Sequence, residues 1–453
     1  MNSFLAAWRP YLKPRMAAML ALGFASGLPL MMVFSKLSFW LREVGVDRST
    51  IGGFYAVSLA YSLKVFWAPV VDRVKLPLLS VLGQRRSWML IAIAGTATGL
   101  FIIGASDPKT SLAPTLFGAF VLAYAGATLD IAVDAWRIES APPDEQANMA
   151  AVYTLGYRLA IMFAGVGLII AEYTSWLVAY WTMAVAMSLV GALVLAIEEP
   201  PRDVRIAPVP QSLGERVRDA VVQPFLQVVR RFGSWAAPVL ALVAIYRLSD
   251  FTMGVMASPF YADLGYSKET VGVITGLFGP WPIVFGGFLG GFIAVRYRLM
   301  TAMLVGAVIT LLTNGAFALL ALAAGPGLDL AANGDATAVV NTPSTTALFV
   351  VVVADNLAAG YVGTVFVAYL SSLTEREYAA TQYALFSSAY SLFCKAFASS
   401  TSGPIADAVG WAGFYGITAL FALPAALLIA VINRGPPSVR GEAEPDVANG
   451  ENA

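Results

Sequence analysis

Long apolar runs separated by short polar loops make up most of the chain. Each run has about 20 residues, the length that an α-helix needs to cross a bilayer. The pattern therefore predicts an all-α integral membrane protein with twelve transmembrane helices. The predicted spans are 16–40, 50–70, 87–105, 113–136, 149–171, 176–196, 236–262, 269–294, 299–323, 345–372, 379–402 and 409–432.

The amino-acid composition supports a membrane protein and excludes several other functional classes. Of 453 residues, 58% are hydrophobic and 12% charged, and the mean hydropathy is +0.72. The net charge is zero, so no basic surface indicates a nucleic-acid partner. The chain has no histidine, and Cys394 is its single cysteine, which excludes an internal disulfide and most metal sites. Any proton coupling must therefore use Asp or Glu.

Lys and Arg gather in alternate loops. Three lie in the N-terminal tail, four in 71–86, six in 202–231, and two more at Arg296 and Arg298, whereas the other loops hold isolated cations. The positive-inside rule then places both termini in the cytoplasm. The first 15 residues lack the apolar core and cleavage site of a signal peptide, so we interpret them as a cytoplasmic tail.

An internal repeat predicts two halves. The stretch from Gly45 to Ala56 matches that from Gly265 to Gly276, each entering a predicted helix. We expect a six-helix half at 1–197, a linker at 198–235 on the inner leaflet, a second half at 236–433 and a disordered tail at 434–453.

Charged residues inside the apolar runs are the candidate functional residues, because burying a charge in a bilayer is costly. Asp130 and Asp134 stand at i and i+4, so two carboxylates share one helical face and one could hold a proton. We expect Asp130 to form a salt bridge with Arg158, and Asp134 to pair with Arg85 or Arg86. Two compatible interpretations remain: a proton relay and a lock on the inner gate.

The second half carries its own charges. Arg247 and Asp250 stand at i and i+3, where they could neutralise each other, or Arg247 could bind a substrate carboxylate or phosphate. Asp355 has no cation on its own helix and is a second coupling candidate. Lys64 and Lys395 could pair with Asp355 or with other acids. Lys64 could instead extend its amine to the membrane surface, as we expect of Lys36.

Aromatic side chains near these charges could stack on sugar rings and donate hydrogen bonds. Most membrane aromatics, however, pack in the protein or form interfacial belts. The candidates for substrate contact are Tyr61, Tyr157, Tyr246 and Tyr390.

One loop resembles a family signature. Asp72-Arg73 followed by Gly83-Gln84-Arg85-Arg86 is similar to the loop between helices two and three of major facilitator transporters. The resemblance implies the twelve-helix major facilitator fold, with Asp72, Arg73, Arg85 and Arg86 in the gating loop.

Longer stretches resemble the AmpG muropeptide permeases. The resemblance implies a monomer that imports anhydro-muropeptides across the bacterial inner membrane, with the proton gradient in place of a cofactor and with substrate, protons and lipid as partners. The acetyl-CoA transporters share related motifs, so a carrier of acetyl-CoA or another anionic metabolite is the alternative. The matching stretches are Gly23–Leu30, Phe66–Arg73, Asp130–Trp136, Gly156–Leu159 and Ala380–Leu385.

Two other classes fit less well. A membrane enzyme needs a nucleophile with its base, or a metal, and a chain without histidine lacks most such arrangements, although an aspartate dyad is conceivable. A receptor would form no solute gradient.

Overall fold

The structure is a computed structural model. It describes residues 13–77, 79–141, 145–200, 230–335, 337–374 and 379–441, and within these the regular elements are helical, with no strand. The predicted all-α class is confirmed for this part of the chain.

Ten helical stretches in the described residues are long and apolar enough to cross a membrane. The chain is therefore a multi-pass membrane protein. The stretches are Pro14–Glu43, Gln84–Ala105, Leu112–Ser140, Asn148–Tyr173, Trp176–Val194, Arg230–Asp263, Lys268–Arg296, Leu299–Ala323, Thr345–Ser372 and Phe386–Ile432.

The difference from the predicted twelve has two sources. The predicted span 50–70 is divided into the short helices α4 (Arg48–Phe54), α5 (Leu59–Leu63) and α6 (Ala68–Arg73), joined by 3₁₀ turns. Pro69, the second residue of α6, has no N–H and so cannot continue the hydrogen bonds of a preceding helix. The last two predicted spans fall within one apolar stretch, α20 (Ala379–Leu420) followed by α21 (Ala422–Ile432), but Gly410 inside α20 has a non-helical backbone, with φ 70° and ψ 178°, so two helical segments meet there.

The described residues form two compact units. The first unit contains the described residues within Met1–Ile206, Val255–Pro280 and Pro326–Thr342. The second unit contains the described residues within Ala207–Gly254, Trp281–Gly325 and Pro343–Ala453.

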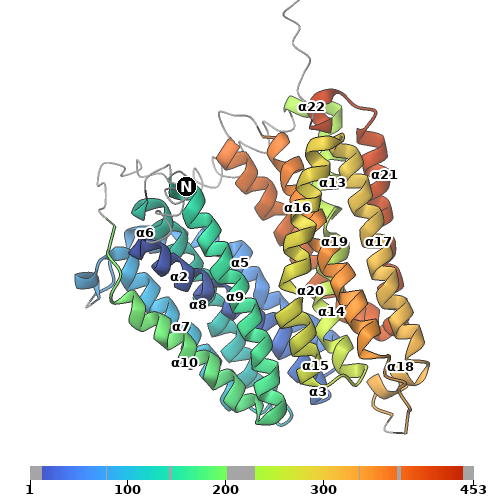
Figure 1. Ribbon diagram of the computed structural model, residues 1–453, viewed down its shortest axis with the longest axis horizontal. Helices are drawn as coiled ribbons and strands as arrows, with labels where there is room; N and C mark the ends of the chain where they lie inside the picture. Colours follow the sequence, from blue (N-terminus) through green and yellow to red (C-terminus); the bar gives the residue numbers. More distant parts are fainter. Residues whose placement is uncertain are drawn as a thin grey trace, which may run out of the picture. The chain divides into compact units, whose positions relative to one another are not determined.

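The first unit is built on close crossings between helices. It contains α2 (Pro14–Met31), the π-helix η2 (Met32–Lys36), α3 (Leu37–Glu43), α7 (Gln84–Ala105), α8 (Leu112–Ser140), α9 (Gln146–Tyr173) and α10 (Trp176–Val194). Helix α2 packs on α9, and α7 packs on both α8 and α10 (Figure 1). A β-carbon on Gly156 would lie 2.1 Å from the carbonyl oxygen of Leu20, so the α2–α9 crossing requires glycine.

Segments from later in the chain complete this unit. They are the end of α14 (Leu248–Asp263), α15 (Lys268–Val271), the π-helix η9 (Gly272–Phe278) and α18 (Gly327–Ala332). Helix α9 crosses η9 backbone to backbone, since a β-carbon on Gly165 would lie 2.6 Å from the Cα atom of Gly276.

The second unit packs α13 (Ala236–Ile245), α16 (Pro280–Arg296), α17 (Leu299–Ala323), α19 (Thr345–Ser372), α20 and α21 around an apolar core. Helix α17 lies beside α19, α20 and α21 (Figure 1). Helices α16 and α19 approach closely, because a β-carbon on Gly286 would lie 2.0 Å from the carbonyl oxygen of Leu357.

The two stretches that match in sequence have the same local structure. Each has a glycine with positive φ, then an N-cap side chain that accepts a hydrogen bond from the backbone N–H three residues on. The glycines are Gly45 and Gly265, the N-caps Asp47 and Ser267, and the donors Thr50 and Thr270.

The predicted linker and tail are described only in part. Residues 201–229 and 442–453 lie outside the described residues. The tail expected to be disordered from 434 instead forms α22 (Pro437–Arg440), in which Val439 is buried and its carbonyl accepts a hydrogen bond from Tyr369. That contact makes the ordered part of the chain longer than hydropathy predicts.

Candidate functional site

Asp130 on α8 lies at the centre of a polar cluster in the first unit. Its Oδ2 atom is 3.5 Å from Nζ of Lys64, and its side chain is 17% exposed. Its Oδ1 atom is buried and accepts no hydrogen bond from the described residues. The expected salt bridge to Arg158 does not form, and Nε of Arg158 is buried with no hydrogen-bond partner among the described residues. Lys64 is therefore the cation of Asp130.

Local helix geometry brings Lys64 to this position. The chain around it is interrupted, with Lys64 opening the 3₁₀ turn η4 (Lys64–Phe66) after α5. Tyr61 on α5 lies over Gly126, one turn before Asp130, because a β-carbon on Gly126 would be 2.3 Å from the phenol oxygen. Glycine at 126 thus allows α5 and the amine that follows it to approach α8.

Tyrosines surround the same carboxylate. Tyr61, Tyr153 and Tyr157 all lie within electrostatic reach of Asp130. The rings of Tyr153 and Tyr157 are 6.5 Å apart, both on α9. The cluster can hold a proton on a carboxylate and offers hydroxyl groups to a polyhydroxylated solute. Tyr153 is the member that the sequence argument missed.

The second unit holds the predicted pair of Arg247 and Asp250. The Nε atom of Arg247 is 3.3 Å from Oδ2 of Asp250, which confirms their predicted proximity. Arg247 lies in the turn between α13 and α14, and Asp250 in the first turn of α14. That first turn is held in place by Ser249, which donates to the carbonyl of Thr418 at 2.6 Å.

Asp355 on α19 is close enough to Asp250 for the two carboxylates to interact. It makes no hydrogen bond or ion pair with the described residues. Asp355 therefore adds a second carboxylate beside the Arg247–Asp250 pair. The guanidinium of Arg247 also lies near α19, where a β-carbon on Gly363 would be 3.8 Å from it.

A third cluster lies where α7 begins. Arg85 donates to Asp72 at 2.7 Å and to both oxygens of Glu139, at 2.6 and 3.0 Å. The expected pairing of Asp134 with Arg85 or Arg86 is wrong: Asp134 lies 3.7 Å from Arg137, one turn along its own helix.

Two acidic partners at this end were missed. Glu139 follows the apolar part of α8, where a charge costs little and gives no sequence signal. Glu199 accepts hydrogen bonds from the backbone N–H groups of Arg85 and Arg86 at 2.7 and 3.0 Å, at the N-terminus of α7. The side chain of Arg86 binds the carbonyls of Val194 and Leu195 at the end of α10. The side chain of Arg73 lies outside the described residues.

Other predicted site residues have packing roles in the structure. Tyr246 is buried, donates to the carbonyl of Met303 at 2.9 Å and stacks on Phe366. Tyr390 packs edge-on against the same Phe366 ring, with centroids 4.9 Å apart. Lys395 is half-buried on α20. Lys36 is 4% exposed, so the expectation that its amine extends to the membrane surface is wrong.

A further ion-pair network, unpredicted from sequence, lies at the end of α3 within the first unit. Arg42 donates to Asp263 at 2.6 Å, and both side chains are below 10% exposure, at 6% and 9%. Lys268 lies 2.5 Å from Glu43. Arg48 is buried and donates to Asn333 at 2.9 Å. These contacts join helices early in the sequence to α14, α15 and α18.

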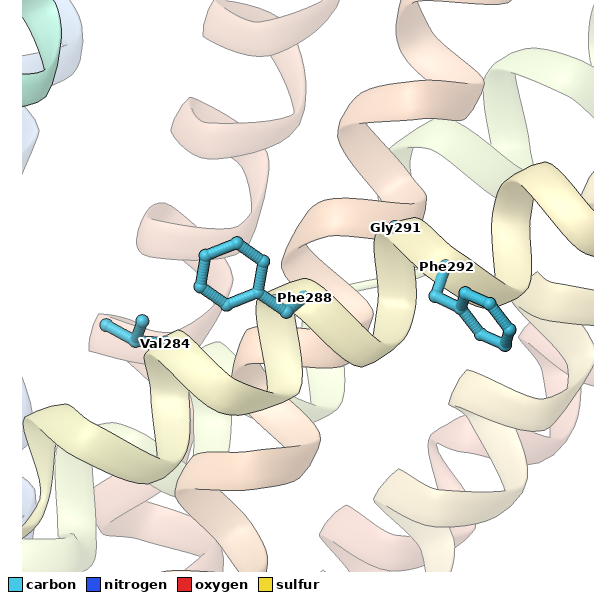
Figure 2. Close-up of a pocket in the computed structure, with 5 residues that line it drawn as sticks. Val284, Phe288, Gly291 and Phe292 are labelled. Carbon is cyan, nitrogen blue, oxygen red and sulfur yellow. The ribbon is translucent and has the colours of Figure 1, made fainter. Parts of the chain in front are cut away.

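An apolar groove of about 450 Å³ runs along α16 (Figure 2). Its lining offers no polar side chain, so it provides no chemistry for a polar solute. The lining residues are Val284, Gly287, Phe288, Gly291 and Phe292.

The sequence and the fold were compared with known proteins. The family model of the Major Facilitator Superfamily matches residues 16–340. The chain is 32% identical over 425 residues to the putative transporter AmpG 4 of Rickettsia conorii, covering 92% of this chain and 96% of the relative. It is 30% identical over 426 residues to the anhydromuropeptide permease of Escherichia coli K12, and the match covers 93% of this chain and 80% of that permease.

Solved structures share the fold at low sequence identity. A bacterial homolog of the human lysosomal transporter Spinster, in an inward-facing and occupied conformation, is similar with a TM-score of 0.67 and 15% identity, covering 97% of this chain and 99% of that one. A D-xylose-proton symporter gives a TM-score of 0.66 at 11% identity, covering 95% and 99%.

Proposed function

The chain belongs to the major facilitator superfamily and, within it, to the AmpG-type permeases, and from that premise we propose that it imports anhydro-muropeptides together with protons. It is a transporter and not an enzyme. The proposed substrates are GlcNAc-anhydroMurNAc and its peptides, carried into the cytoplasm for reuse of the cell wall.

We also propose the membrane arrangement that this function needs. The chain lies in the bacterial inner membrane with both termini in the cytoplasm, as its Lys and Arg distribution favours. Twelve helices form two six-helix halves, 1–197 and 236–433, and the substrate is reached from alternate sides. The protein acts as a monomer and needs no cofactor besides the proton gradient.

The observation that carries the coupling proposal is the pair of Asp130 and Lys64. In the deprotonated state the carboxylate compensates the ammonium at 3.5 Å. A proton on Asp130 removes that compensation and leaves Lys64 able to bind an anionic group of the substrate. The interaction energy of the Asp130–Lys64 pair can in this way shift the equilibrium between the two access states of the transporter.

The substrate contacts follow from chemistry. Tyrosines around Asp130 suit the rings and hydroxyls of a disaccharide. Arg247 presents a planar donor set suited to a carboxylate. Asp355, which interacts with Asp250, is the second carboxylate that we propose to carry a proton.

Transport into proteoliposomes tests the function. Purified protein is reconstituted with an alkaline interior, and uptake of labelled anhydro-muropeptide is measured beside labelled acetyl-CoA. We expect muropeptide to accumulate above its external concentration and the accumulation to vanish when a protonophore collapses the gradient.

Failure of muropeptide to accumulate would overturn the proposal. Accumulation of acetyl-CoA would favour the alternative of an anionic-metabolite carrier. The exposed loop variant Asp107→Asn serves as the matched control for carboxylate substitutions, since Asp107 lies in a surface turn.

A further inference from the structure

Asn314 is a buried amide in the second unit that the proposed function leaves unused. It lies inside α17, in the apolar run from Leu311 to Leu320, and is 1% exposed. A polar side chain in the interior of a membrane helix is costly, and those that occur usually have a function. Its hydrogen bonds therefore show what this amide does.

The direction of the hydrogen bond follows from the partner. Nδ2 of Asn314 lies 2.8 Å from the hydroxyl of Ser249, and that hydroxyl lies 2.6 Å from the carbonyl oxygen of Thr418 on α20. A carbonyl oxygen can only accept, so the single hydroxyl proton of Ser249 goes to Thr418. The hydroxyl oxygen then needs a donor, and the amide N–H of Asn314 supplies it.

Nothing nearby replaces this donor. Ser249 is 1% exposed and Thr418 0%, so water does not reach the hydrogen bonds between the three residues. Oδ1 of Asn314 is buried and accepts no hydrogen bond from the described residues. A leucine of similar size would avoid the cost of that unsatisfied oxygen. The donor to Ser249 is therefore what the amide offers and an apolar side chain does not.

Ser249 lies directly beside the groups that hold Arg247. Nε of Arg247 is 3.3 Å from Oδ2 of Asp250, and its Cζ atom lies 5.8 Å from the centre of the Phe251 ring. Asp250 and Phe251 are the two residues that follow Ser249 in the first turn of α14. A shift of this turn would therefore move both contacts of the guanidinium.

The helix is interrupted at the same point, since residues 246 and 247 form a turn between α13 and α14. Before the turn, the carbonyl of Ala244 accepts a hydrogen bond from the thiol of Cys394 on α20 at 3.3 Å. After the turn, Ser249 is bound by Thr418 and Asn314. Substrate sites of transporters are often formed at interrupted membrane helices, so supports on both sides of this turn fit a binding role for Arg247.

We propose that Asn314 is a positioning residue: through Ser249 it fixes the first turn of α14, and so holds the guanidinium of Arg247 in the orientation that binds a carboxylate of the substrate. This inference rests on the proposed function. All proposed substrates carry such a group, either the lactyl carboxylate of the bare disaccharide or the carboxylates of the peptide. Asn314 itself does not touch the substrate.

The first test replaces Asn314 by leucine, which removes the donor at similar volume. Initial uptake of labelled GlcNAc-anhydroMurNAc is measured in proteoliposomes with an alkaline interior and normalised to reconstituted protein. We expect the KM to rise about tenfold, because the hydroxyl of Ser249 loses its donor in a buried site. The kcat should stay within about twofold of the wild type, since only binding changes.

The matched control is Thr313→Val on the same helix. Thr313 is also buried, but its hydroxyl donates within α17, to the carbonyl of Thr310 at 3.3 Å. Both kinetic constants should stay at the wild-type values. A merely structural loss in Asn314→Leu would instead lower the kcat through inactive protein and leave the KM unchanged.

Combined variants test whether Asn314 acts through Ser249 and Arg247. Ser249→Ala breaks the same chain of hydrogen bonds and should raise the KM by a similar factor. Asn314→Leu added to Ser249→Ala should have no further effect. In an Arg247→Gln background neither change should raise the KM further, because the group that they position is gone.

Several outcomes would overturn the inference. A wild-type KM in folded Asn314→Leu would do so, as would an equal rise of the KM with and without Arg247. If Asn314→Leu fails to reach the membrane, an unchanged KM in Ser249→Ala has the same consequence. No transport by the wild type would reject the proposed function together with this inference, whereas the other outcomes reject the inference alone.

Discussion

Glu145 shows how a single residue can make stability depend on pH. Hydrogen bonds from Lys13, with further help from Arg15, hold the pKa of Glu145 below its ordinary value. Because the pKa is lower in the folded state, the contribution to stability is present above the unfolded-state pKa. It is lost as the pH falls through the folded-state pKa.

We therefore expect Glu145→Gln to lower the melting temperature of the detergent-solubilised protein at pH 7. The difference from the wild type should shrink as the pH falls below about 4, where free Glu is protonated. A difference that stays constant from pH 7 to pH 3 would contradict this explanation. The measurement is a series of thermal unfolding curves for both proteins.

Charges inside apolar runs are the residues that sequence predicts best. Asp130 and Asp355 stand out because hydrocarbon surroundings penalise charged groups, and the Arg247–Asp250 contact follows from their separation of three residues. Partners on other helices depend on which faces meet. Lys64 was therefore named only as a possible partner of Asp355 or other acids, while Arg158 was expected opposite Asp130, and Glu139 was missed as the partner of Arg85.

At the scale of elements, the crossing of α9 with η9 is a place where two backbones touch. A β-carbon on Gly276 would lie 2.4 Å from the Cα atom of Gly165, and the obstructing atoms are backbone. Neither side can yield by a rotamer change, so the helices must separate if either residue gains a side chain.

We expect Gly276→Ala to reduce muropeptide uptake at least about tenfold, an effect of the size that strain of 1–3 kcal/mol in one state can produce. Gly315→Ala on α17 is the matched control, because a β-carbon there meets nothing within 4 Å. Initial uptake rates normalised to reconstituted protein give the comparison. Wild-type uptake by Gly276→Ala would show that the crossing is not needed.

Elements are predicted well where the signal is local and poorly where it is not. The repeat around Gly45 and Gly265 folds alike because turn and cap chemistry act over a few residues. The interruptions of the second predicted span and the turn at Arg247 leave the hydropathy unchanged. Pro69 marks one of the interruptions locally, whereas the approach of Tyr61 to Gly126 on α8 is a contact between helices that hydropathy does not predict.

At the scale of the whole molecule, hydropathy predicts the all-α multi-pass class but not the division of the described residues into two compact units. Segments from 255–280 and 326–342 belong with the first unit. Ion pairs such as Arg42 with Asp263 hold them there. Sequence shows these charges only as isolated loop residues, so the network could not be predicted from it.

Coupling of transport to protons is a property of the whole cycle, and it can be separated from substrate movement. Exchange of muropeptide across the membrane needs substrate binding and alternating access but no net proton flow. Accumulation of muropeptide needs substrate binding, alternating access and net proton flow. If Asp130 carries the proton, the Asp130→Asn variant should retain exchange and lose accumulation. The two activities can be measured in the same proteoliposomes.

The most direct test is therefore Asp130→Asn in proteoliposomes loaded with unlabelled anhydro-muropeptide, compared with the wild type and with Asp107→Asn. Labelled substrate is followed first without a pH gradient and then, in empty vesicles, with one. We predict exchange within a few-fold of the wild type, with accumulation abolished. Gradient-driven accumulation by Asp130→Asn at the wild-type level would contradict the account.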